Sequence, residues 1–162
     1  MTLTEKTDSA QDMKTAFWQA LAKSPFVMLT RDDDPASAAP MTAPLDKDAN
    51  SAIWFFTSRD NRFAALGEAT GVYAAKDHSL FARFAGTLVE EVSEAVKDRL
   101  WDNTVEAWFP KGKSDPNLLL IRMELGDASI WGAEMGTFNV IKMLLGQDVR
   151  HSVSGQHAET ML

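Results

Sequence analysis

Residues 53–66 read IWFFTSRDNRFAAL, an apolar run that passes into two hydroxyl side chains and then a basic segment. The run 53–56 is typical of a buried strand, whereas residues 60–66 have helical spacing. Thr57 and Ser58 therefore fall at the junction, where the unpaired amides of a helix start attract an anion. Arg62, one turn along, can offer a guanidinium fork to a phosphate group.

The same residues have a second interpretation that needs no ligand. Thr57, Ser58 and Asp60 are all side chains that cap helices, and in that case Arg62 would lie in solvent. Short motifs of this kind match by chance, so the pattern alone does not choose between a phosphate site and a capped helix.

The composition indicates one compact domain. The chain has 162 residues, of which 45% are hydrophobic, and its five Trp and nine Phe can supply a sizeable core. A formal charge of -7 and a pI near 4.9 argue against neutralisation of nucleic-acid phosphates or adhesion to an anionic membrane. The N-terminus lacks an apolar signal core and no window reaches about 18 apolar residues, so we expect a cytoplasmic protein.

The inventory of reactive side chains is small. No Cys occurs, which excludes disulfides, thiolate metal sites and cysteine nucleophiles. The three histidines, His78, His151 and His157, do not have the spacing of a zinc or iron site, so no metal is predicted. Redox chemistry would therefore need a bound cofactor.

Strand signals dominate the chain. The expected strands are residues 26–30, 38–45, 53–56, 70–75, 80–92, 118–125 and 129–131, with an acidic turn at 31–36 and another turn at Gly126 and Asp127. Pro40 and Pro44 in the second strand indicate a sheet edge or a bend. Mostly hairpin-length connections favour an antiparallel barrel over a doubly wound parallel sheet.

Helices are expected at the periphery. Ser9 can cap a first helix that ends before Ser24, and a helical stripe over residues 93–108 is interrupted near Asp102. Thr137 can cap a last helix that ends before Gly146. We expect a domain over residues 1–146, followed by a polar, weakly structured tail over residues 147–162.

Five segments together carry a resemblance to a known family. They are SAAPMTAPLD at 37–46, the stretch at 53–66, WDNTVEAWFPKGKSDPNLLLIRM at 101–123, ASIW at 128–131 and SGQHAETML at 154–162. In this order they resemble the pyridoxamine 5'-phosphate oxidase-like flavin-binding split barrels, and the branch that they resemble most is the general stress protein 26 group. The similarity covers nearly all of residues 12–131, and the ordered set is far more specific than any single motif.

The resemblance implies a mainly β (α+β) fold, a six-stranded antiparallel split barrel with peripheral helices. It also implies a homodimer that binds flavin mononucleotide (FMN) in two clefts at the subunit interface. Thr57, Ser58 and Arg62 match the phosphate corner of the family, whereas the isoalloxazine ring would lie along the second strand, supported by an aromatic of the third. The ring-contacting positions are Met41, Thr42, Ala43 and either Phe55 or Phe56, and Trp108, Phe109 and Trp131 match aromatics that close the cleft from the second subunit.

One departure concerns the charge near the flavin. Relatives commonly carry an Arg directly before the Pro-Met of the second strand, but this chain has Ala39 before Pro40. A cation there would favour the anionic ring formed on reduction, so its absence bears on both binding and turnover. The substrate-phosphate set of true pyridoxamine 5'-phosphate oxidases is also not reproduced, and we do not expect that reaction.

Three functions follow from these observations. The first is an FMN-dependent oxidoreductase with an unknown substrate, in which no side chain can be named as the acid or base. The second is a non-catalytic stress protein that binds flavin or a related phosphorylated molecule. The third is a structural or interaction dimer with an empty cleft. FMN is preferred over flavin adenine dinucleotide (FAD) or a deazaflavin only by analogy, and fold analogy does not settle chemistry.

Overall fold

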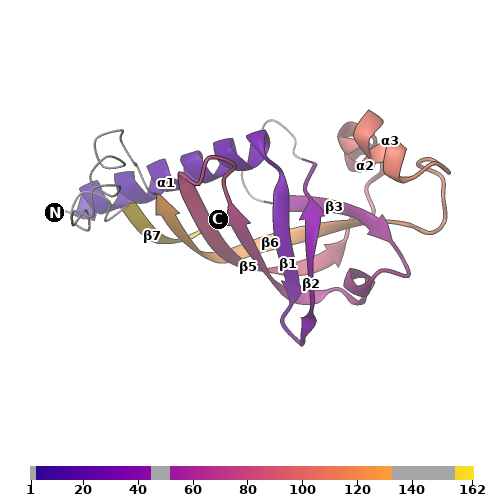
Figure 1. The fold of residues 1–162 in the computed structure, drawn as a ribbon, viewed down its shortest axis with the longest axis horizontal. Coiled ribbons are helices and arrows are strands. Elements are labelled where there is room, and N and C mark those ends of the chain that lie inside the picture. Colours follow the sequence, from indigo (N-terminus) through magenta and orange to yellow (C-terminus); the bar gives the residue numbers. More distant parts are fainter. Residues whose placement is uncertain (1–2, 45–51, 133–155) are drawn as a thin grey trace, which may run out of the picture.

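The fold was obtained as a computed structural model, which describes residues 3–44, 52–132 and 156–162. Figure 1 shows a long N-terminal helix lying along a twisted antiparallel sheet. In chain order the elements are α1 (Leu3–Lys23), β1 (Phe26–Arg31), β2 (Asp34–Thr42), β3 (Ala52–Ser58), the 3-10 helix η1 (Arg62–Ala65), β4 (Gly67–Ala74), β5 (Leu80–Glu90), α2 (Glu94–Leu100), α3 (Asn103–Trp108), β6 (Leu118–Gly132) and β7 (Gln156–Met161).

The sheet has the order β2-β1-β4-β5-β6-β3, and all of its pairings are antiparallel. Strand β6 is long enough to hold two partners in succession on one side: β3 pairs with its first half and β7 with its second. Because β2 and β3 stand at opposite ends of this order and yet approach each other, the sheet curls into a barrel that is split between them. The expected mainly β split barrel is confirmed.

A bulge bends the two longest strands. Between Phe84 and Gly86 on β5, the pairing moves from Ala128 to Leu125 on β6, so β6 carries an extra residue. The sequence had predicted a turn at Gly126 and Asp127 with two separate strands, which is wrong, because one continuous strand absorbs that residue. Gly86 is required beside the bulge, since a Cβ there would lie 2.6 Å from the carbonyl oxygen of Glu124.

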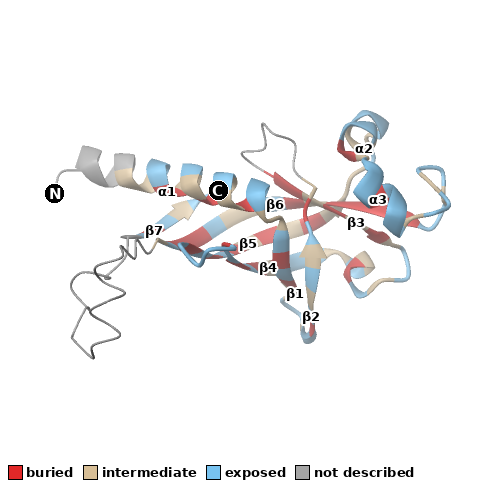
Figure 2. Cartoon of the chain, turned by 45° about the horizontal axis from the view of Figure 1, so that its top comes forward, coloured by how far each residue is buried: buried red, intermediate tan, exposed pale blue. Residues whose placement is uncertain are grey.

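The main core lies between α1 and the concave side of the sheet. Met13, Phe17 and Leu21 recur at helical spacing and are fully or almost fully buried, as Figure 2 shows for the sheet-facing side of α1. The ring of Phe17 meets those of Tyr73 and Phe84 edge to face. Strands β4 and β5 alternate buried and exposed residues, so one of their faces belongs to this core.

A second, smaller apolar cluster holds the helices α2 and α3 against the outside of β3 and β6. Leu100 and Val105 from the helices are buried, as are Leu118 and Leu120 from β6. The predicted interruption of this helical stretch near Asp102 is confirmed, because the Asp102 side chain caps α3 by accepting from the Val105 amide at 2.9 Å.

Three boundaries differ from the expected ones. Helix α1 begins at Leu3, so Ser9 lies inside it and is not its cap. Strand β2 already begins at Asp34, which shortens the acidic turn predicted at 31–36. The tail contributes β7, because alternation directs Ala158 inward and His157 outward in register with β6. The helix predicted between Thr137 and Gly146 lies outside the described residues.

Candidate functional site

The predicted ring-contacting residues lie on the two strands that flank the split in the barrel. Met41 and Thr42 end β2, with Ala43 directly after them, while Phe55 and Phe56 lie on β3. No ladder of hydrogen bonds between β2 and β3 is found among the described residues. Alternate backbone amides and carbonyls of such edge strands have no sheet partner, so they are free to meet the donors and acceptors of a polar ring edge.

The side chains of these residues face different ways. Met41 and Ala43 point to the core, and Ala43 is fully buried, whereas Thr42 is exposed on the other side of β2. Phe55 is also fully buried in the core. A flat ligand in the split would therefore touch the backbone of β2 and the Thr42 side more readily than the side chain of Ala43.

Phe56 belongs to the helical side of β3. Its ring contacts Trp101 at 5.5 Å and Phe109 at 6.5 Å between centroids, both from the region of α2 and α3. This explains why the sequence alone could not choose between Phe55 and Phe56: one is core and the other anchors the small helices. Phe109 likewise packs inward here, and Trp108 beside it is 77% exposed.

The predicted phosphate corner folds as a tight turn followed by a single helical turn. The expected helix over residues 60–66 is reduced to the four residues of η1. Its cap is Asn61, whose Oδ1 accepts from the Phe63 amide at 2.9 Å, and not Thr57, Ser58 or Asp60. Thr57 is buried and Ser58 lies on the opposite face of β3, so the two hydroxyls do not converge as predicted.

Most donors at this corner already have acceptors. The Arg59 amide donates to the Asn117 carbonyl and the Asn61 amide to the Ser58 carbonyl. The Ser58 hydroxyl donates to Asp60, and this bond is the largest cause that lowers the pKa of the Asp60 carboxyl. A phosphate here would have to compete with that carboxylate for the hydroxyl, so its attraction to the site would depend mainly on cations.

Arg62 is exposed, but it is not simply in solvent. Its Nη1 lies 3.4 Å from the carbonyl oxygen of Ser37, across the split on β2. Arg31, at the end of β1, donates from Nη1 to the carbonyl of Arg62 at 3.3 Å. Sequence reasoning missed Arg31 because it precedes three acidic residues and was assigned to a turn; only the pairing of β1 with β2 brings it here.

Trp131 lies far from β2 within one chain. It is 41% exposed on β6 and stacks on His157 of β7 with ring centroids 5.0 Å apart. Strand β6 comes nearest to β2 through β3, but β3 pairs with β6 only as far as Glu124, and Trp131 lies seven residues further, about 23 Å along the strand. One protomer therefore does not bring Trp131 onto the same small ring as Met41 and Thr42.

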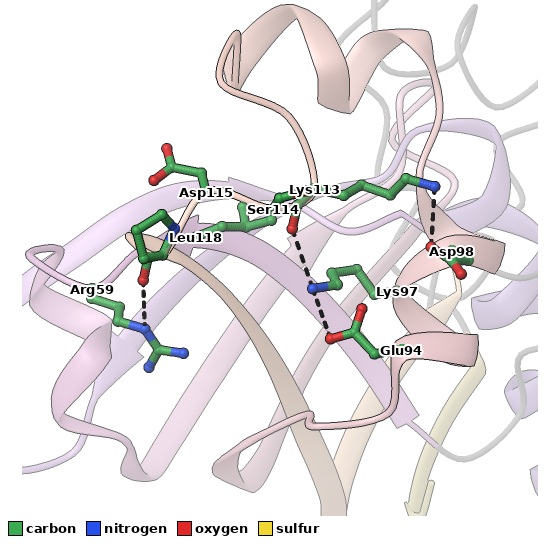
Figure 3. Close-up of a pocket in the computed structure, with 9 residues that line it drawn as sticks. Arg59, Glu94, Lys97, Asp98, Lys113, Ser114, Asp115 and Leu118 are labelled. Carbon is green, nitrogen blue, oxygen red and sulfur yellow. Dashed lines mark hydrogen bonds and ion pairs between the residues drawn. The ribbon is translucent and has the colours of Figure 1, made fainter.

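A surface hollow of about 530 Å³ lies beside this corner, between Arg59, α2 and the loop before β6. Figure 3 shows Lys97 reaching Glu94 and the carbonyl of Lys113, while the Lys113 side chain reaches Asp98 at 3.0 Å. Arg59 donates to Glu90, which lowers the pKa of that carboxyl. The cationic side chains Arg59, Lys97 and Lys113 all have hydrogen-bond acceptors. We therefore assign these contacts at the hollow to anchoring the loop before β6.

The described residues include no group of three or more His, Asp or Glu side chains placed to hold a metal ion. In the same part of the chain, no helix combines the length and the apolar character that crossing a bilayer requires.

Comparison with known proteins gives consistent results. A family model described as pyridoxamine 5'-phosphate oxidase like matches residues 12–154. A comparison with curated proteins finds no match. The solved structure of the general stress FMN/FAD binding protein from the phytopathogen Xanthomonas citri is 40% identical, with a TM-score of 0.71, over 78% of this chain and 92% of that one.

Two further structures extend the comparison. A general stress family protein from Xanthomonas campestris pv. campestris is 38% identical, with a TM-score of 0.68, over 78% of this chain and 92% of that chain. A general stress protein 26 from Jannaschia sp. CCS1 is 23% identical, with a TM-score of 0.75, over 94% and 99% of the two chains, and it supports the fold alone. The family match and the split barrel together lead to one conclusion: this chain belongs to the pyridoxamine 5'-phosphate oxidase-like family.

Proposed function

We propose that this protein is a general-stress-type flavoprotein that binds FMN in the split between β2 and β3. The observation that carries the proposal is its 40% identity, over 92% of the relative's chain, to a protein named for FMN/FAD binding. The position of the matching residues agrees with it, because Met41, Thr42 and Arg62 lie on the two sides of that split.

In this proposal each part of the chain has a physical role. The unpaired backbone of β2 near Thr42 meets the pyrimidine edge of the flavin, and apolar side chains meet its dimethylbenzene edge. Arg62 and the Ser58 hydroxyl hold the phosphate, with Thr57 supporting the turn from inside. The flavin itself would supply the electron transfer, and the protein positions it and excludes water.

We further propose that the protein works as a homodimer. One convex sheet face, which we call the outer face, presents large apolar side chains that are 41–61% exposed: Phe26, Met28, Val72, Phe81, Trp131 and Met161. Such a face on a chain of charge -7 favours a partner. A second copy would also supply the Trp131 that one chain cannot bring to its own β2, and Trp108 with its exposed ring is the other candidate.

An oxidoreductase with a small organic substrate is the leading version of this function. The alternative is a flavin-binding stress protein without turnover, and Ala39 favours it, because no cation occupies that position beside the ring. Neither version includes oxidation of pyridoxamine 5'-phosphate.

The test begins with the colour of the purified protein. Bound oxidised flavin absorbs at about 370 and 450 nm. Titration of the apoprotein with FMN, FAD and riboflavin then ranks the three ligands by affinity. A colourless protein that takes up none of them would rule out both flavin-binding versions. Bleaching of the loaded protein by NADH or NADPH without oxygen supports the oxidoreductase, whereas persistent yellow colour with every donor favours the binder.

A further inference from the structure

We propose that Arg31 is a second phosphate-binding cation that acts together with Arg62. The inference rests on the proposed function, since it concerns how the same site recognises a phosphorylated flavin. It is carried by the position of Arg31 in the sheet, by its contacts, and by an unused donor of its guanidinium group.

The pairing of β1 with its two neighbours places Arg31 at the end of the β1–β2 hairpin. Leu29 is opposite Ala39 on β2, but the register then shifts, and Arg31 is opposite Asp34. On the other side of β1 the ladder is regular, with Leu29 opposite Gly71 and Arg31 opposite Ala69, so Arg31 and Leu29 share one face of β1. The shift brings the Arg31 amide to the Ser37 hydroxyl of β2.

The contacts of Arg31 direct it to the phosphate corner. Its side chain is only 17% exposed, and its Nη1 donates to the backbone carbonyl of Arg62. The amide of Arg31 donates to the Ser37 hydroxyl at 2.8 Å, and Arg62 reaches the carbonyl of the same Ser37. Ser37 is buried, so its contacts hold both arginines at one position on β2.

Arg31 and Arg62 both contact Ser37, so two positive charges lie in the same region and together attract an anion. The only carboxylate paired with Arg31 among the described residues is Asp33, whose Oδ2 lies 2.8 Å from Nη2. That carboxylate is 70% exposed, so solvent screens the pair.

Only one of the two donors on the guanidinium edge that faces Asp33 has a hydrogen-bond partner. Nε and Nη2 form two parallel donors that suit a carboxylate or phosphate, but the buried Nε has no hydrogen-bond partner. Buried donors without a partner are rare in folded proteins. A phosphate that displaced Asp33 could engage both donors at once, and Arg62 would bind it from the other side.

A simpler role for Arg31 is structural, to connect the β1–β2 hairpin to η1 through the Arg62 carbonyl. The two roles predict different affinities for FMN and for riboflavin, which lacks the phosphate. Loss of a structural contact would change the affinity for both ligands or for neither, whereas loss of a phosphate-binding residue would change the affinity for FMN alone.

The experiment measures FMN and riboflavin affinity by flavin fluorescence for the full chain and its variants. Arg31→Gln should weaken FMN binding by about tenfold or more and leave riboflavin binding within about twofold. Arg99→Gln, at an exposed arginine of α2 away from the outer face, is the matched control and should change neither. Equal losses for both ligands, or no loss for FMN, would overturn the proposal.

A second variant does not depend on removal of a partly buried side chain. Asp33 is 70% exposed and its carboxylate competes with a phosphate for the Arg31 guanidinium. Asp33→Asn should therefore strengthen FMN binding severalfold and leave riboflavin binding unchanged, because Nε and Nη2 of Arg31 become available to the phosphate. Unchanged FMN affinity in this variant would contradict the proposal. If the unmodified protein binds neither flavin, the proposed function itself fails, and that result is distinct from a protein that binds FMN and riboflavin equally well.

Discussion

The carboxylate of Glu91 accepts a hydrogen bond from the indole Nε1 of Trp54 at 3.1 Å. Glu91 directly follows β5, whereas Trp54 lies on β3, and β6 runs between the two strands. The other oxygen of Glu91 accepts from Arg122 of β6 at 2.9 Å, and the carboxylate side chain is only 7% exposed. This buried carboxylate therefore ties three strands together and fixes β3, one side of the proposed flavin site.

Loss of the charge at Glu91 should destabilise the fold. In Glu91→Gln the Arg122 guanidinium loses its buried partner, and we expect the free energy of unfolding to fall by about 1–3 kcal/mol. Urea unfolding followed by Trp fluorescence measures this change. Glu124→Gln is the control, because Glu124 also pairs with Arg122 but is 55% exposed, so its effect should stay below about 1 kcal/mol. Equal effects of the two variants would contradict this account.

A charge at the centre of the outer face should separate the proposed dimer. Val72 is 50% exposed and pairs with Met28 in the middle of that face. Val72→Arg would place two unpaired cations in the interface, so we expect dimerisation to weaken at least about tenfold. Light scattering after size-exclusion chromatography reports the mass.

Val92→Arg is the matched control for the dimer, because Val92 is 80% exposed but lies after β5 and outside the face. This variant should remain dimeric. A dimer that survives Val72→Arg and dissociates with Val92→Arg would move the interface to the helical end of the molecule.

Removal of the Arg62 guanidinium should affect phosphate recognition directly. Arg62→Gln is expected to cost about 1.5–3 kcal/mol of FMN affinity and much less for riboflavin. Arg59→Gln is a control from the same turn, because Arg59 is occupied by Glu90 and the Pro116 carbonyl. If the two variants bind FMN equally well, Arg62 has no special role.

The attachment of β7 should weaken in acid. Glu159 accepts from the Ser129 hydroxyl at 2.6 Å, which is the largest cause that lowers its pKa, and His157 and Arg83 contribute further. Since its pKa is lower in the folded state, its contribution is present above the pKa of the unfolded chain and is lost as the pH falls through the folded value.

Hydrogen-exchange protection of residues 157–161 should therefore decrease on acidification below the ordinary glutamate pKa of 4.5. In Glu159→Gln the same residues should show lower protection at neutral pH and little further change in acid. Protection that falls equally in both proteins would assign the pH effect to another group.

The sequence predicted the parts of this fold that depend on local pattern. Alternation located β4 and β5, and Pro40 correctly indicated an edge strand. Gly126 and Asp127 have the composition of a turn, but whether such a pair turns the chain or makes a bulge depends on the strands beside it.

The site residues themselves stay predictions, but two of their local assignments can be compared with the fold. The segment around Met41 was assigned to a strand and lies on β2, and Arg62 was assigned to a helix start and lies in η1. The cap at Asn61 is local, but Thr57, Ser58 and Asp60 offered the same chemistry in the sequence. The occupied amide of Arg59 depends on a partner distant in sequence, the Asn117 carbonyl. The same holds for Arg31, whose neighbours are known only once β1 has paired with β2.

Strand β7 has a consequence for the solubility of the chain. It pairs with β6 from Asp127 to Gly132, so the backbone of that half of β6 is satisfied within the molecule. Without these last residues, β6 would present a row of bare amides and carbonyls beside apolar side chains such as Ile130, a template on which other polypeptides can add as in amyloid. In its place β7 becomes the edge, and this six-residue strand carries the polar side chains of His157, Glu159 and Thr160, which make it a poorer template for an added strand.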